Sequence, residues 1–416
     1  MRRGFTLIEL LVVIAILAVL AVVVVLTLNP AGLLQEARDS NRISDMATIN
    51  SALGLSLADN ASESLGSANT VYVSVPDTST TCANLGLPTL PSGYSYHCST
   101  AATSTYRRTD GTGWIPVNLS ANTFGSSMAQ LPQDPVNVTS SRLYYTYETD
   151  GLGRYEATTP FESSKYKLGG TSDQISGDGG TLASVYEKGS KLGMEPLDYG
   201  DPSLVGLWTF DEGTGSVAYD YSGNNATGSW NGTPTGTAGF YSPGRIGGWA
   251  GSFNGTNDGI GIGGVSAFSG TLTVSFWMNP VDNTSRSILN RGNWCGTGGF
   301  RIDSSGPGGG LKYFYMYQST FGAFQMTSSP VVGLWNYITL VQNGAALTLN
   351  FYLNGQPNNS TTLPTGFKDF LNTLYIGTGD PGCGLSSYYS GLIDDVRIYN
   401  RALSASEVSA LYNGGK

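Results

Sequence analysis

Few residues in this chain are suited to acid–base or nucleophilic chemistry. His97 is the single histidine among 416 residues, and it directly precedes Cys98 in a tyrosine-rich stretch. A Ser-His-Asp type of site needs a histidine beside its nucleophile, and a histidine metal site needs several of them. We therefore expect His97 to be structural or to face solvent.

The four cysteines form two pairs by position, Cys82 with Cys98 and Cys295 with Cys383. No Cys-x-x-Cys spacing occurs, which argues against a metal or redox role for the thiols. In an oxidising compartment each pair would close within its own domain and stabilise loop-rich structure. The cysteines therefore favour an exported protein with disulfide bonds.

The bulk composition favours an extracellular, mostly β protein. The chain has a formal net charge of -9, 12% charged residues and 57 glycines. A surface that binds nucleic acid needs clustered positive charge, so this balance argues against nucleic-acid binding. The abundant small neutral residues suit short strands and turns, and the length predicts two or three folded units.

The first 28 residues contain a long apolar segment behind a short basic start. An unbroken apolar run covers residues 10–26, and residues 5–28 are long enough to cross a hydrocarbon core of about 30 Å as a helix. Arg2 and Arg3 favour a cytoplasmic N-terminus. An ordinary secretory signal is cut after its apolar core, whereas the small residue at a plausible boundary here, Gly4, precedes it. The segment predicts a single membrane-spanning helix.

The residues from Gly4 to Glu9 read Gly-Phe-Thr-Leu-Ile-Glu and follow a basic leader. This stretch resembles the class III signal of type IV prepilins and of type II secretion pseudopilins. The resemblance implies a leader of residues 1–4 that a prepilin peptidase cuts off between Gly4 and Phe5, usually with methylation of the new amino group on Phe5. It also implies assembly with other pilin or pseudopilin subunits through the N-terminal helix.

Glu9 is the one carboxylate at the start of this apolar helix. A carboxylate within a membrane helix costs roughly 2.5 to 3.5 kcal/mol on insertion scales, so we expect it to have a partner. The resemblance implies that this partner is the Phe5 amine of a neighbouring subunit. The alternative is a capping box with Thr6, which the positive end of the helix dipole favours, and the two states can alternate.

Residues 29–168 are expected to form a pilin-like head of one amphipathic helix and a small antiparallel sheet. Pro30 and Gly32 interrupt the apolar run, and apolar residues then recur at spacings of three and four. Alternating runs at residues 71–75 and 143–147 predict strands. The expected helix face consists of Leu33, Ala37, Ile43, Met46, Ala47, Asn50, Leu53 and Leu57.

Two further segments of this region have weaker patterns. Residues 131–137 resemble the C-terminal loop of major pseudopilins, which binds calcium in some relatives, but their acidic spacing favours a structural loop. Residues 169–203 are rich in glycine, serine and aspartate and show little apolar periodicity. We expect them to form a linker or an irregular subdomain.

Strand-like runs return from residue 204 onward, with glycine or asparagine between them. This pattern predicts a β-sandwich. Apolar residues alternate from Leu347 to Leu353, and the run ends at Asn354-Gly355, a strong hairpin signal.

Five stretches in this half resemble the concanavalin A-like, laminin-G type of jelly roll. The resemblance covers residues 204–416 and implies a two-sheet jelly roll that commonly binds carbohydrate or protein and often holds one calcium ion. The stretches that carry it are residues 206–212, 220–224, 252–255, 391–399 and 400–408.

Calcium prefers several oxygen ligands, which aspartates and loop carbonyls supply. Asp220 in a turn and Asp394 beside the final strand are the candidates that we favour, with Asn225, Asn254 and Asp258 as weaker helpers. The alternative is that Asp220 makes an Asx-turn and that Asp394 ends a strand.

Tryptophans are concentrated in this half of the chain, and exposed tryptophan or tyrosine faces often stack on sugar rings. Those in strand patterns are expected in the core, and those in glycine-rich loops are candidates for ligand contact. The core set is Trp208, Trp277 and Trp335, and the ligand-contact set is Trp230, Trp249 and Trp294.

Glycan-hydrolysing relatives of the jelly roll carry Glu-x-Asp-x-Glu on one strand. The nearest arrangement here, Glu148 and Asp150, is broken by Leu152. Asp394 and Asp395 are adjacent, so they would point to opposite faces of a strand. We therefore expect binding without catalysis.

The expected fold is an α+β pilin-like domain with a long N-terminal membrane helix, followed by an all-β jelly-roll sandwich. We expect a type IV pilus or pseudopilus subunit that passes through the inner membrane and then presents an adhesive domain for a glycan or protein at the cell surface. Two alternatives stay open. One is a non-adhesive minor pseudopilin of a type II secretion-like system, and the other is a glycan-hydrolysing jelly roll.

Overall fold

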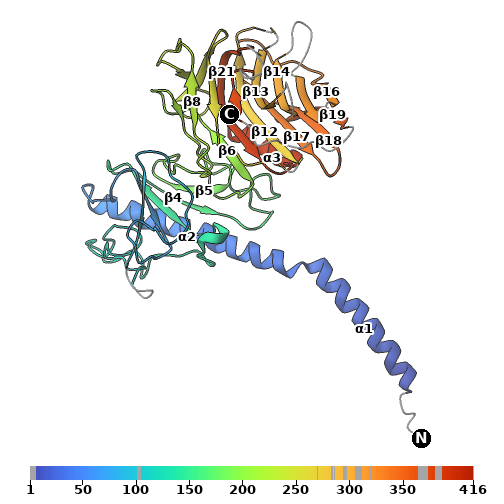
Figure 1. Ribbon diagram of the computed structural model, residues 1–416. Helices are drawn as coiled ribbons and strands as arrows, with labels where there is room; N and C mark the ends of the chain where they lie inside the picture. The colour runs from blue at the N-terminus through green and yellow to red at the C-terminus, as the bar shows by residue number, and fades with distance from the viewer. Residues whose placement is uncertain are drawn as a thin grey trace.

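The protein consists of a protruding N-terminal helix, a small head and a larger β-sandwich (Figure 1). The structure is a computed structural model. It describes residues 6–100, 105–268, 270–282, 284, 286–293, 298–304, 312–317, 320–363, 373–379 and 387–415.

Helices α1 (Leu7–Leu28) and α2 (Pro30–Asp59) meet in a bend at Asn29 (Figure 1). The backbone of Asn29 is left-handed, with φ of 40°, and its side chain accepts a hydrogen bond from the Gly32 N–H at 3.3 Å. Proline at the first helical position lacks a donor that would be unpaired there anyway. The interruption expected at Pro30 is therefore observed.

The first fourteen residues of α1 present their apolar side chains to the outside of the molecule. Every side chain from residue 7 to residue 20 is exposed, and Leu7 and Ile8 expose 76% and 73% of their surface. Over the residues that the structure describes, no helix has the length and apolar character needed to cross a membrane.

Helix α2 packs on a five-stranded sheet to form the head. Its buried face includes Met46 and Leu53 as expected, whereas Leu33 and Ala37 are exposed in the first turns of α2. Ala47 is exposed because one residue further along a helix is a rotation of about 100°, which turns it away from the face of Met46. The sheet is antiparallel except that β1 and β2 pair in parallel. In the order β2-β1-β3-β4-β5, its strands are Ser95–Cys98, Thr70–Val73, Thr146–Thr149, Tyr155–Pro160 and Val185–Gly189, and a 3-10 turn covers Thr139–Ser141.

Residues 169–203 belong to the folded head and are not the linker that their composition suggested. Strand β5 pairs with β4 along its whole length, and Leu197 and Tyr199 are buried. The Tyr199 ring stacks on Tyr144 at 4.9 Å between centroids. Buried carboxylates that accept backbone N–H bonds hold much of this segment, and such bonds leave no apolar periodicity in a sequence.

The C-terminal half forms two eight-stranded sheets, which we call the β21 sheet and the β13 sheet. The β21 sheet has the order β19-β18-β17-β12-β21-β10-β9, and β6 also pairs with β21. Its strands are Gln356–Thr362, Thr348–Leu353, Asn336–Asn343, Leu272–Pro280, Ser390–Tyr399, Trp249–Asn254, Tyr241–Pro243 and, for β6, Leu204–Trp208. The β13 sheet, in the order β16-β15-β14-β13-β20-β11-β8-β7, consists of Thr320–Gln325, Lys312–Tyr317, Gly298–Ser304, Arg286–Asn293, Leu374–Ile376, Gly259–Ile262, Gly228–Asn231 and Val217–Ala218.

A continuous apolar core lies between the two sheets, as in a jelly-roll sandwich. The other face of the β21 sheet is also covered, by helix α3 (Ala405–Gly414) and by Leu168 and Ala183 of the head. The predicted hairpin is confirmed, because β18 and β19 pair through Asn354 and Gly355, which have φ of 52° and 73°.

Candidate functional site

Glu9 caps helix α1 within its own chain. Its carboxylate accepts hydrogen bonds from the N–H and the hydroxyl of Thr6, each at 2.8 Å, and the Thr6 hydroxyl oxygen accepts from the Glu9 N–H at 3.3 Å. This is the capping box named above as the alternative. Glu9 is exposed, so pairing with a neighbouring subunit stays a prediction. Gly4 and Phe5 lie outside the described residues.

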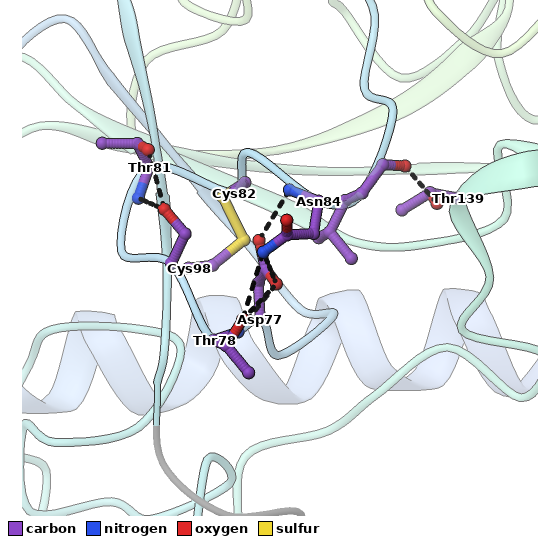
Figure 2. The surroundings of a disulfide bond; sticks show 9 residues. Asp77, Thr78, Thr81, Cys82, Asn84, Cys98 and Thr139 are labelled. Atoms are coloured by element: carbon purple, nitrogen blue, oxygen red, sulfur yellow. Dashed lines mark hydrogen bonds between the residues drawn. A yellow bond between two sulfur atoms is a disulfide. The ribbon is translucent and has the colours of Figure 1, made fainter.

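Cys82 and Cys98 form a disulfide bond, as the sequence predicted (Figure 2). Their Cα atoms are 5.3 Å apart and both residues are buried. The bond closes a loop of the head that ends in strand β2. Cys295 and Cys383 lie outside the described residues.

The loop closed by this disulfide, residues 82–98, reaches the jelly roll. Beside the disulfide, Asp77 accepts hydrogen bonds from the N–H and the side-chain amide of Asn84, each at 3.0 Å (Figure 2). Further along, the Thr89 N–H donates to the Gly223 carbonyl at 3.3 Å. The disulfide loop is therefore part of the junction between head and jelly roll.

His97 lies on β2 and packs against a tyrosine of the neighbouring strand. Its ring is 5.2 Å from that of Tyr72, and burial lowers the pKa of His97. A neutral, half-buried imidazole beside an aromatic ring fits the structural role that we expected.

Asp220 makes the Asx-turn named above as the alternative to calcium binding. One carboxylate oxygen accepts the N–H groups of Ser222, at 2.9 Å, and Leu207, at 3.1 Å. The other accepts the N–H of Ala226 at 2.9 Å. Through these hydrogen bonds the buried carboxylate links its own turn to strand β6.

Asp394 lies in the middle of β21 and does not end the strand. Its Oδ2 accepts the N–H groups of Arg245, at 2.7 Å, and Ile246, at 3.0 Å, while its buried Oδ1 has no hydrogen-bond partner within the described part of the chain. Burial raises the pKa of Asp394 well above its usual value. Asp394 and Asp220 therefore hold different backbone segments.

The three weaker calcium candidates form local turns. Asp258 accepts the N–H groups of Thr233 and Asn254, at 2.8 and 3.2 Å. The Asn254 side chain in turn accepts N–H groups of its own turn, and Asn225 has a left-handed backbone with φ of 60°. Throughout the described ranges, no three His, Cys, Asp or Glu side chains are grouped to hold a metal. These placements do not fit a shared calcium ion, and calcium binding stays a prediction to be tested.

The tryptophans divide differently from the expectation. Trp208 and Trp277 are buried as expected, and Trp335 is partly buried against the cluster that covers the β21 sheet. Trp230 was expected in an exposed loop, but it lies in β8 and stacks on Phe240 with centroids 4.8 Å apart. Its position inside the sandwich removes it from the ligand-contact set. Of the other two candidates, Trp249 is half-buried at the start of β10 and Trp294 lies outside the described residues.

A buried ion network joins the head to the jelly roll. The Arg397 guanidinium on β21 donates to Asp395 at 2.9 Å and to Asp198 of the head at 2.7 Å. All three side chains are buried. Beside them, Arg401 pairs with Asp201 at 2.8 Å. Sequence reasoning missed this network because its partners lie about two hundred positions apart.

Buried carboxylates that pair with no Lys, Arg or His of the described residues fill the side of the head sheet opposite α2. Glu148 and Glu156 face each other across β3 and β4, and the Glu156 carboxylate accepts the N–H groups of Gly193, Met194 and Glu195. Burial raises the pKa of Glu195 to about 8, and burial together with Glu156 raises that of Glu187 to about 10. Buried carboxyls of this kind are protonated at neutral pH. The sequence offered one signal for these carboxylates: Glu148 directly follows Tyr147, and neighbouring residues of a strand point to opposite faces of the sheet.

Two family models match the chain at its two ends. Residues 1–25 match the prokaryotic N-terminal methylation motif, and residues 254–409 match the concanavalin A-like lectin/glucanases superfamily. The chain thus carries the pilin type of N-terminal signal and a lectin-like jelly roll, which confirms both resemblances.

Three individual proteins each resemble half of the chain or less. The adhesion G-protein coupled receptor V1 of Danio rerio is 25% identical over 156 residues, 34% of this chain and 2% of that protein. Domain 4 of AbnA, an extracellular arabinanase of Geobacillus stearothermophilus solved with arabinotriose, has 24% identity and a TM-score of 0.42 over 50% of this chain and 98% of that one. The binding domain of Paraclostridial Mosquitocidal Protein 1 has 17% identity and a TM-score of 0.40 over 50% and 52%.

Proposed function

We propose that this protein is a subunit of a type IV pilus or pseudopilus that presents its jelly roll as a non-catalytic, glycan-binding adhesive domain. The observation that carries the assembly part is α1, an apolar helix whose described side chains are exposed. Such a surface needs a membrane before assembly and neighbouring helices afterwards. The match of residues 1–25 to the methylation motif supports the same route.

The processing step follows from the signal. A prepilin peptidase would cut after Gly4, which exposes the Phe5 amine four residues before Glu9. In the single chain Glu9 is bonded to Thr6, so assembly would exchange this capping box for an ion pair with the Phe5 amine of a neighbour. The exchange compensates the Glu9 charge inside the filament.

Intact-mass analysis of protein purified from its native membrane tests the proposed processing. We expect loss of Met1 to Gly4, and retention of Met1 would contradict the pilin assignment. Glu9→Ala should leave membrane insertion intact and reduce incorporation into filaments. Thr6→Ala is the matched control, since it removes the capping box but leaves the Glu9 carboxylate for a neighbour.

A non-adhesive minor subunit that primes or caps a filament is the second candidate. It is favoured by the size of the jelly roll, which lies beside the head and would hinder further stacking (Figure 1). A glycan microarray probed with the full chain in detergent separates the two, since a capping subunit needs no glycan. Release of sugar from a bound glycan would instead indicate the hydrolase.

A further inference from the structure

Head and jelly roll together enclose a polar cavity of about 230 Å³. We propose that this cavity binds one sugar unit of a neutral or amino-bearing glycan, a proposal that rests on the adhesive function above. Both parts contribute to its lining, so neither would bind alone. The lining residues that matter here are Tyr94 and Glu195 from the head and Asp211, Tyr221, Asp395 and Arg397 from the jelly roll.

The donor in the cavity is held rigidly. Arg397 is bonded to Asp395 and Asp198, and these ion pairs come from opposite sides of the junction. An arginine whose planar guanidinium is already fixed loses little conformational freedom when it meets a ligand hydroxyl. The cavity therefore has a preorganised guanidinium at its wall, whose charge Asp395 and Asp198 already compensate.

Acceptors and aromatic rings complete a set suited to sugar hydroxyls. Asp211 is an exposed residue at the rim, and its Oδ1 is held by the N–H groups of Gly248 and Trp249 at 2.7 and 3.0 Å. Tyr94 and Tyr221 each offer a half-buried ring and a hydroxyl. Carboxylate acceptors, a fixed guanidinium and tyrosine faces are the groups that orient a ring rich in hydroxyls.

The size and the charge of the cavity restrict which ligands we expect it to bind. Among the described residues, no three His, Cys, Asp or Glu side chains are grouped to hold a metal ion, so we assign no metal to the cavity. Asp395 and Asp198 already compensate the charge of Arg397, and Asp211 adds a negative charge. An acidic sugar would be repelled, whereas a neutral or amino sugar would not.

The disulfide loop determines where Tyr94 lies. Tyr94 precedes β2 in the loop that the bond between Cys82 and Cys98 closes. The same loop contacts Gly223, whose φ of 80° and contact with Pro88 leave no room for a side chain. The loop thus places a head tyrosine against the jelly roll.

The test uses the full chain in detergent on a microarray of neutral, amino-sugar and uronic-acid glycans. We expect Tyr94→Ala, a change in the head, and Asp211→Asn, a change of charge with little change in shape, each to lower the neutral or amino-sugar signal at least tenfold. Uronic-acid glycans should give no signal with any variant. Tyr375→Ala, the same kind of truncation on β20 of the opposite sheet, is the matched control and should bind like the parent.

Each outcome decides a different question. If the parent binds no glycan, the adhesive function itself is wrong. If the parent binds and both cavity variants bind equally well, the cavity is not the site, while the adhesive function stands. Loss of binding in Tyr375→Ala alone would place the site on the β13 sheet. Melting of each variant shows whether it is folded, and if Tyr94→Ala is not, the result for Asp211→Asn decides.

Discussion

The head and the jelly roll are stabilised by different means. The jelly roll has one large apolar core between its sheets and buried carboxylates such as Asp220 and Asp394 that accept backbone N–H groups. The head supplements a smaller apolar cluster with a disulfide, buried ion pairs of Arg42 and a larger group of buried carboxylates. Apolar burial changes little with pH or redox conditions, but charges and disulfides respond to both. We therefore expect changes in pH to act more strongly on the head than on the jelly roll, where burial also raises the pKa of Asp394, and reduction of the bond between Cys82 and Cys98 to act on the head.

The largest expected effect is from Arg42 of α2. Its guanidinium pairs with Asp39 at 2.7 Å and Asp134 at 2.6 Å, all fully buried. Arg42→Ala would leave both carboxylates unpaired and should destabilise the head by about 3 to 5 kcal/mol. Hydrogen exchange read by mass spectrometry separates head peptides from jelly-roll peptides. Arg38→Ala, which removes a partly exposed pair with Glu162, is the control and should cost about 1 kcal/mol or less.

Removal of the disulfide should cause the next largest loss of stability in the head. A bond across a loop of about 15 residues restricts the unfolded chain by about 3 kcal/mol, and Cys82 and Cys98 are 16 positions apart. Replacing both with serine should raise exchange in strands β1 and β2. Jelly-roll peptides should keep the protection of the parent, and equal loss in both parts would show that they unfold as one unit.

Per pH unit, the effect of pH should be smaller than these two changes, and it should be strongest in the head, although burial also raises the pKa of Asp394 in the jelly roll. Burial raises the pKa of Glu195 to about 8 and of Asp178 to about 7. A carboxyl whose folded pKa is raised stabilises the fold fully below its unfolded pKa near 4.5, and this contribution is lost as the pH rises through the folded pKa. For each such group, the free energy of unfolding of the head should fall by up to about 1.4 kcal/mol per pH unit as the pH rises from 5 to 7. Glu195→Gln, which cannot ionise, should flatten the dependence measured by melting, and an unchanged slope would contradict the assignment.

Calcium should have the smallest effect. An ion present at a hundred times its Kd would stabilise the jelly roll by about 2.7 kcal/mol. Since Asp220 and Asp394 already accept backbone N–H groups, we expect little change in melting when calcium is added or chelated. A clear rise in melting temperature with calcium that disappears in Asp394→Asn would confirm calcium binding. The contrast between head and jelly roll would then be wrong, because the jelly roll would also respond to ions.

Sequence patterns predicted the parts of the molecule that depend on local chemistry. The interruption expected at Pro30, the hairpin at Asn354-Gly355 and the capping box of Thr6 and Glu9, which was the alternative to an ion pair with a neighbouring subunit, depend on residues within a few positions of one another. The alternation of apolar residues likewise predicted strands such as β18.

Predictions from composition were less successful. The segment of residues 169–203 folds into the head through carboxylates that bind N–H groups, and Trp230 lies in the core although glycines surround it in sequence. The segment of residues 169–203 has no periodic apolar signal, because hydrogen bonds from a side chain to a distant backbone place no demand on neighbouring residues. Strand β8 does alternate between buried and exposed residues, but Gly228, Ser229 and Asn231 beside Trp230 are not apolar enough to show it in the sequence.

The sequence by itself determined the N-terminal signal, the helix bend, the jelly-roll class and the cysteine pair of the head, since each depends on short motifs or regular spacing. Only the tertiary structure decided which charged side chains form ion pairs. Arg397 joins Asp198 across the junction, and Tyr94 comes to line a cavity with Asp211, only after both parts have folded. Contacts between residues more than a hundred positions apart depend on the packing of whole sheets, and no local pattern encodes that packing.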